Sequence, residues 1–98
     1  MEDYYKDYDY KEDELEYLGQ ALAHIKVKLS IDEEDEEQDA LLAELCSDAY
    51  DYMYVFFDCN RDSDNYMLPT SLMFVLENVV LKRYRRIGAE GIVIEKID

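Results

Sequence analysis

The chain has 98 residues, of which 49% are hydrophobic, and its 25 acidic and 10 basic side chains give a formal net charge of −15. This length allows one domain with a modest core, and no apolar run approaches the roughly 20 residues needed to span a bilayer, so we expect no membrane contact. Residues 1–66 carry 21 acidic and 5 basic side chains, a net of −16, whereas residues 67–98 carry 4 and 5. Such segregated charge bears on binding partners, not on fold.

The N-terminal segment 1–12 contains the run "DYYKDYDYKE", which alternates acidic residues with tyrosines and has no apolar periodicity. It is loosely similar to an epitope tag, and we interpret it as a disordered tail, tag-derived or natural, that lies outside the fold. The first helical pattern follows, from Glu14 to Leu29. Its apolar residues recur in steps of three and four, which predicts one buried helix face: Leu15, Leu18, Leu22, Ile25 and Leu29.

The stretch "SIDEEDEEQD" predicts the start of a second helix, because Ser30 and Glu33 match a capping box and acidic residues suit a helix N-terminus. Apolar residues of this helix repeat as far as Phe56, although the aromatic run 54–57 would also allow a strand. The expected buried face is Leu42, Leu45, Cys46, Ala49, Tyr52, Met53 and Phe56. We interpret the acidic run as a solvated face or as a negative wall to which DNA does not adhere: Asp32, Glu33, Glu34, Asp35, Glu36 and Glu37.

The polar break "DCNRDSDNYM" resembles a calcium loop only in its first half. Asp58, Asn60 and Asp62 occupy ligand positions, but serine stands where glycine is required and Pro69 where a bidentate glutamate is required, so we expect a solvated loop without calcium. Cys46 and Cys59 have no spacing for zinc and predict reduced thiols. His24, the only histidine, has no partner that would make it a catalytic base. We therefore predict no enzyme activity, no metal and no cofactor.

A third helix is expected from Leu68, with Pro69 in its first turn, to Ile87, with Gly88 as its C-terminal cap. Its expected core face, again with helical spacing, is Leu68, Leu72, Val75, Leu76, Val79, Val80, Arg83, Tyr84 and Ile87. The segment "IVIEKI" at 92–97 is β-branched, and we expect it to be extended and to pair with another chain. The sequence thus predicts an all-α fold: a bundle of about three helices over 13–88 and an extended, flexible C-terminal docking arm over 89–98.

Four of the ten basic residues lie within five positions, at Lys82, Arg83, Arg85 and Arg86. They allow three interpretations. They could contact nucleic-acid phosphates, although the remaining charge of the chain weakens that attraction. They could complement a helix C-terminus. They could also meet the acidic body of a second copy, in a head-to-tail contact that closes a ring.

The segments "LSIDEEDEEQDALLAELCSDAYDYMYVFFD", "LPTSL" and "LKRYRRIGAEGI", in this order, resemble the head–tail connector, or DNA-packaging adaptor, proteins of long-tailed phages over about residues 18–95. The resemblance implies a helical, non-enzymatic virion protein, present in the host cytoplasm before assembly. It implies a ring beneath the portal that extends the DNA channel and receives a tail or stopper protein.

By the same resemblance, the acidic run would face the channel, and DNA would pass without specific binding. The segment Lys82 to Gly91 would be a hinge into the docking arm. The expected interface residues are Lys82, Arg83, Arg85, Arg86, Gly88, Gly91, Ile92, Val93 and Ile94. An acidic DNA mimic that inhibits a nucleic-acid-binding enzyme is the alternative, which the net charge suits but the basic cluster does not.

Overall fold

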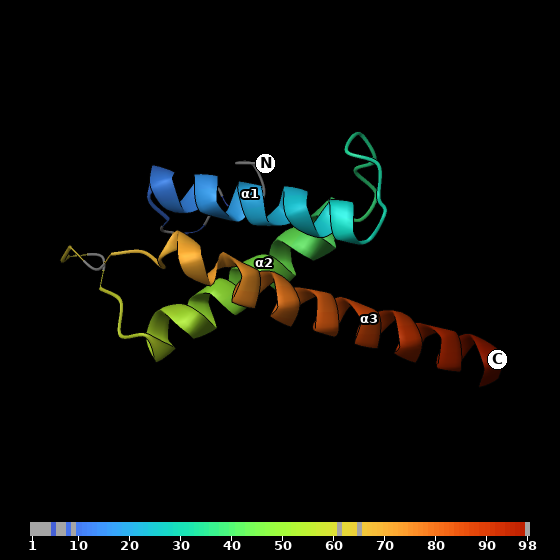
Figure 1. The fold of residues 1–98 in the computed structure, drawn as a ribbon. Coiled ribbons are helices and arrows are strands. Elements are labelled where there is room, and N and C mark those ends of the chain that lie inside the picture. The colour runs from blue at the N-terminus through green and yellow to red at the C-terminus, as the bar shows by residue number, and fades with distance from the viewer. Residues whose placement is uncertain (1–4, 6–7, 9, 61, 65, 98) are drawn as a thin grey trace.

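The computed structural model describes residues 5, 8, 10–60, 62–64 and 66–97, with only the backbone described from residue 89 onward. Three α-helices, α1 (Glu12–Lys28), α2 (Asp39–Phe56) and α3 (Met73–Ile97), and one 3-10 turn, η2 (Thr70–Leu72), make up the fold. The described residues contain no strand, which confirms the predicted all-α class. Figure 1 shows α1 lying across α2 and α3, with the C-terminal end of α3 projecting beyond the other two helices.

The helix α1 buries the middle of the predicted face, whereas Leu15 and Leu29 at its ends are only partly buried. Its first turn is acidic, and the Lys11 backbone N–H donates to Glu14 Oε1 at 3.0 Å, so a free N–H group at the helix start is satisfied. Leu18, Leu22 and Ile25 are fully buried. Burial of each such side chain contributes about 1.5–3 kcal/mol to stability, so this stripe is one of the main sources of the core.

Ser30 ends α1, and the prediction that it caps the next helix is wrong. Its φ is 60°, its N–H donates to the Val27 carbonyl at 3.1 Å, and Ile31 N–H donates to the Lys26 carbonyl at 2.9 Å. This is the Schellman arrangement, in which a left-handed residue satisfies the last helical carbonyls. The acidic run therefore lies in a loop, and α2 begins only at Asp39.

The helix α2 confirms helix over strand for the aromatic run up to Phe56, but part of its predicted buried face is wrong. Cys46 and Ala49 are buried and Met53 is 5% exposed, whereas Tyr52 is 66% and Phe56 70% exposed. Tyr52 stands about 100° around the helix from Met53. Phe56 lies in the last turn of α2, beyond Met53, where the buried stripe ends.

The helix α3 confirms the predicted core face at Leu76 and Val80, both fully buried, whereas Arg83 and Ile87 at the far end of that face are exposed because the helix projects beyond the bundle there. It does not stop at Gly88 but continues to Ile97, so the expected extended arm over 89–98 is helical in its backbone through residue 97. No described glycine has a positive φ, so Gly88 is not a left-handed cap. Extending an existing helix satisfies backbone groups without a new nucleus, whereas a lone strand would need a partner chain.

Two tyrosines of the N-terminal segment, Tyr5 and Tyr10, pack on the bundle, although we interpreted this segment as lying outside the fold. Tyr5 is 3% exposed and its hydroxyl donates to the Ala43 carbonyl at 2.9 Å. Tyr10 donates to Asp51 Oδ1 at 2.9 Å, and its ring meets that of Tyr50 edge to face at 5.6 Å. The two hydrogen bonds join residues 38 and 41 positions apart, so the local spacing of apolar residues could not predict them. The rest of the predicted tail, residues 1–4, 6, 7 and 9, lies outside the described residues.

We expect the fold to lose stability steeply at alkaline pH. Burial raises the pKa of Tyr17 and of the Cys46 thiol to about 12 each, and it raises the pKa of Tyr5 as well. Groups whose folded pKa lies above the unfolded value stabilise fully below the unfolded value, about pH 10 for tyrosine, and lose this contribution as pH rises through the folded pKa. Urea unfolding followed by circular dichroism between about pH 8 and about pH 11.5 should show this loss. If all ten tyrosines titrate together near pH 10 while the helices persist, this expectation is contradicted.

Candidate functional site

The described residues contain no group of three or more histidine, cysteine, aspartate or glutamate side chains that could hold a metal ion. Cys46 is a buried free thiol and Cys59 a partly buried one, as predicted. His24 Nδ1 lies 2.9 Å from Glu77 Oε2, and Lys28 Nζ lies 2.8 Å from Glu77 Oε1. His24 thus helps to join α1 to a buried carboxylate on α3, a partner that its neighbours in the sequence did not indicate.

The loop 30–38 is organised by one buried lysine that sequence reasoning missed. Lys26 Nζ lies 2.8 Å from Asp39 Oδ1 and donates to the Glu33 carbonyl at 3.1 Å and the Asp35 carbonyl at 2.6 Å. The hydrogen bond with Asp39 raises the pKa of Lys26 above its usual value, so the ammonium stays charged. The available signal was a lysine directly after buried Ile25 and a few residues before the acidic run.

The six carboxylates of the acidic run are held outward by this loop. Asp32 and Asp35 each accept a backbone N–H two residues ahead, from Glu34 at 2.9 Å and Glu37 at 3.0 Å. These turns replace the helical start that we predicted. All members of the run are exposed: Asp32, Glu33, Glu34, Asp35, Glu36 and Glu37. The loop is therefore a fixed negative surface at the N-terminal end of α2.

A small hollow borders this loop. It is lined mainly by apolar atoms of α1 and of the residues that follow it, and its volume is about 230 Å³. Val27 is 77% exposed there. We call it the acid-rimmed hollow, because Glu33 stands at its edge beside the rest of the acidic run; its lining residues are Ala23, His24, Lys26, Val27, Ile31 and Glu33.

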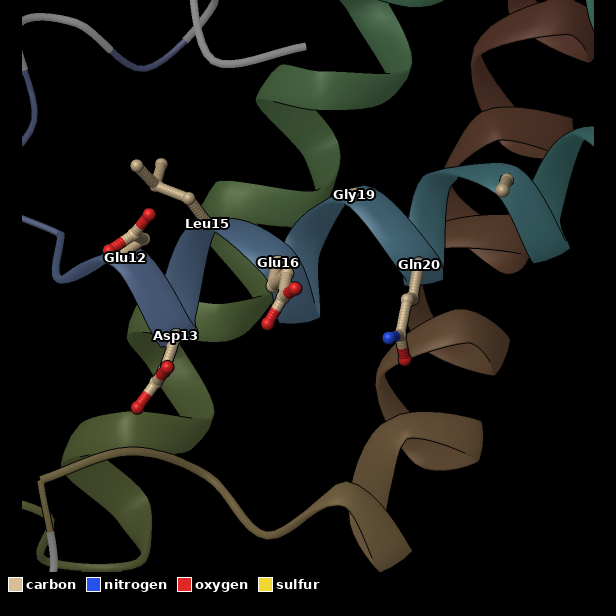
Figure 2. A pocket seen from close by; sticks show the side chains of 7 residues that line it. Glu12, Asp13, Leu15, Glu16, Gly19 and Gln20 are labelled. Carbon is tan, nitrogen blue, oxygen red and sulfur yellow. The ribbon is translucent and has the colours of Figure 1, made fainter.

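The outer face of α1 is also negative. Figure 2 shows Asp13, Glu16 and Gln20 pointing to the same side of the helix. Together with Gly19 and other residues of α1 they line a gap on this helix. Side chains three and four positions apart share a helix face. The gap is lined by one helix alone, and we read it as a solvated face.

The four predicted cations lie together on the projecting part of α3. Lys82, Arg83, Arg85 and Arg86 are exposed and, with Val79, line a hollow of about 600 Å³. Within the part of the chain that the structure describes, none of them forms an ion pair. They do not complement a helix end at Gly88, because α3 continues to Ile97.

The remaining predicted interface residues, Gly88, Gly91, Ile92, Val93 and Ile94, follow the cations in α3. Gly88 is exposed, and a Cβ built on it would meet nothing within 4 Å. The side chains of residues 91–94 lie outside the described residues, so only their helical backbone is established.

An apolar groove between α2 and α3 adjoins the cations and was not predicted. We call it the aromatic groove; α2 and the residue after it contribute Tyr52, Met53, Phe56 and Phe57, and α3 contributes Val75, Val79 and Arg83. The rings of Tyr52 and Phe56 stack at 6.4 Å, and those of Phe56 and Phe57 meet edge to face at 5.1 Å. Contiguous exposed apolar surface with a polar rim marks interaction sites. Two of its aromatic residues, Tyr52 and Phe56, were predicted to belong to the buried face of α2.

Across the described residues, no helix is both long and apolar enough to cross a bilayer. The profile of the phage gp6-like head-tail connector protein family matches residues 20–98. Neither the curated proteins nor the solved structures contain a match to the chain.

Proposed function

The chain belongs to the phage gp6-like head-tail connector protein family, and from this membership we propose that its copies form a ring beneath the portal. The ring extends the DNA channel and provides the attachment site for a tail or stopper protein. The family match over residues 20–98 carries this proposal. The described residues also offer exposed interaction surfaces, namely the basic residues of α3 and the aromatic groove, which a structural role in the virion would use.

The projecting end of α3 is the part that we propose contacts the portal or a neighbouring copy. The helix has 25 residues, or about 37 Å of length at 1.5 Å per residue. Its last buried residue among those described is Leu81. The four cations follow directly, and Arg83 still borders the groove between α2 and α3, so the basic surface begins at the edge of the bundle. An exposed charged helix of this kind steers and orients a partner. We still propose a docking role for the segment 89–98, but as the end of a helix and not as an extended arm.

The acidic run is proposed to face the DNA channel. The carboxylates from Asp32 to Glu37 are exposed and Lys26 holds their loop in place. A negative wall repels the phosphate backbone, so DNA slides past without specific binding. The alternative, an acidic DNA mimic, explains the net charge but gives no use to the exposed cations of α3.

Deleting residues 89–98 should abolish attachment of tails to DNA-filled heads while the bundle stays folded. The deletion leaves the buried face of α3, which includes Leu76 and Val80, untouched. The measurement is complementation of a phage that lacks this protein, with particles counted by electron microscopy and folding checked by circular dichroism. Full-length protein supplied in the same way is the control. Infectious virions made with the truncated protein would refute the docking role of this segment.

A further inference from the structure

The aromatic groove is an unpartnered surface with a positive rim. Tyr52 is 66%, Phe56 70% and Phe57 43% exposed, and aromatic residues at the centre of a contact are common binding hot spots. Arg83 lines both this groove and the hollow that holds Lys82, Arg85 and Arg86. An occupant must therefore combine apolar atoms with negative charge around them.

The acid-rimmed hollow of the same chain has these properties. Its exposed Val27 lies between Ala23 and Ile31, and Glu33 with the exposed acidic run borders it. The one lysine among its lining residues, Lys26, has its ammonium group bound to Asp39 and two backbone carbonyl groups. The hollow therefore presents a small apolar centre with carboxylates beside it, opposite in charge to the rim of the aromatic groove.

We propose that the aromatic groove of one copy receives the acid-rimmed hollow of a second copy. This inference rests on the ring proposed above and names the two faces that form it. The groove lies at the C-terminal end of α2 and the hollow beside the loop that precedes α2, so about 27 Å, the length of 18 helical residues, separates them. One copy cannot join its own two faces over that distance.

Charge argues against the other contacts between copies. Two grooves facing each other would bring Arg83 against Arg83, and a groove that received the neighbour's projecting α3 would meet Lys82, Arg85 and Arg86 of that copy. Like charges brought close together in an interface disfavour that contact. A groove-to-hollow contact is heterologous, because two different faces meet, and such contacts generate rings when the rotation between copies closes.

A mixing experiment tests this arrangement. Phe56→Glu blocks the groove and Val27→Lys blocks the hollow, so each variant alone should stay monomeric in sedimentation velocity at concentrations where the natural protein associates. Mixed in equal amounts, they should form dimers and nothing larger, since one intact groove and one intact hollow remain. Each substitution should weaken self-association by at least about 30-fold, the loss typical of a hot spot. Association of the natural protein should also weaken as salt is raised.

Two control variants add the same charges at exposed positions that line neither face. Val55→Glu adds the same charge at a 79% exposed neighbour of Phe56 that does not line the groove, and Gln20→Lys adds a lysine on the exposed side of α1. Both should associate like the natural protein. Self-association of either blocked variant, a mixture that stays monomeric, or natural protein that is monomeric at low salt and high concentration would each overturn the proposed contact. If Phe56→Glu or Val27→Lys still completes virions, the proposed contact is wrong but the connector function stands. If virions form without the protein at all, the connector function is wrong.

Discussion

Lys26→Met should lower the free energy of unfolding by about 3–5 kcal/mol, the usual loss when one partner of a buried ion pair is removed. The side chains of Lys26 and Asp39 are only 7% and 10% exposed. Methionine keeps the length of the lysine stem but leaves the Asp39 carboxylate and the carbonyls of Glu33 and Asp35 without this donor. Urea denaturation followed by circular dichroism measures the loss, and hydrogen exchange should show faster opening of the loop 30–38.

Two further variants make this result specific. Lys82→Met removes an exposed lysine on α3 that has no ion-pair partner among the described residues, and its effect should stay within about 0.5 kcal/mol. Combining Lys26→Met with Asp39→Leu removes both charges, so the double variant should be more stable than Lys26→Met alone. A loss below about 1 kcal/mol for Lys26→Met would show that the loop is not held by this lysine.

Leu76→Ala should cost about 2–5 kcal/mol, because it opens a cavity where the three helices meet. Leu76 is fully buried, and the helices α1 and α2 both pack against α3. A single domain of this size is stable by only about 5–15 kcal/mol, so the change removes a large share. Thermal and urea unfolding of the two proteins give the difference directly.

Ile87→Ala is the matched control for this prediction. Ile87 lies on the same helix but is 42% exposed, so the substitution should cost less than about 1 kcal/mol. Equal losses at the two positions would mean that the projecting part of α3 is packed as tightly as the bundle. A loss below 1 kcal/mol at Leu76 would instead show that its helix face is not core.

Local pattern predicted most of the bundle. The steps of three and four along α1 and α3 indicated Leu18, Leu22, Ile25, Leu76 and Val80, and all five are fully buried. The motif order also pointed to the connector family that the profile match shows. The grouping of the four cations needed only their closeness in the chain.

Helix ends and the candidate surfaces could not be predicted in this way. Ser30 looked like an N-cap, but the loop after it is held by Lys26 and Asp39, which are separated by the whole acidic run. Tyr52 and Phe56 looked like core because they continue the helical spacing of the apolar residues of α2, yet the packing of α2 against its neighbours leaves them exposed. Gly88 looked like a cap, but capping needs a left-handed backbone that no described glycine adopts.

The sequence by itself determined the class of fold, the buried stripes of α1 and α3, and the separation of acidic from basic segments, because each depends on neighbours within one or two helical turns. Tertiary structure alone decided that Tyr5 packs under Ala43, that a buried lysine holds the acidic loop, and that aromatic residues of α2 form a groove beside the cations of α3. These features join residues far apart in the chain, and their energies come from burial and pairing that only the assembled bundle provides.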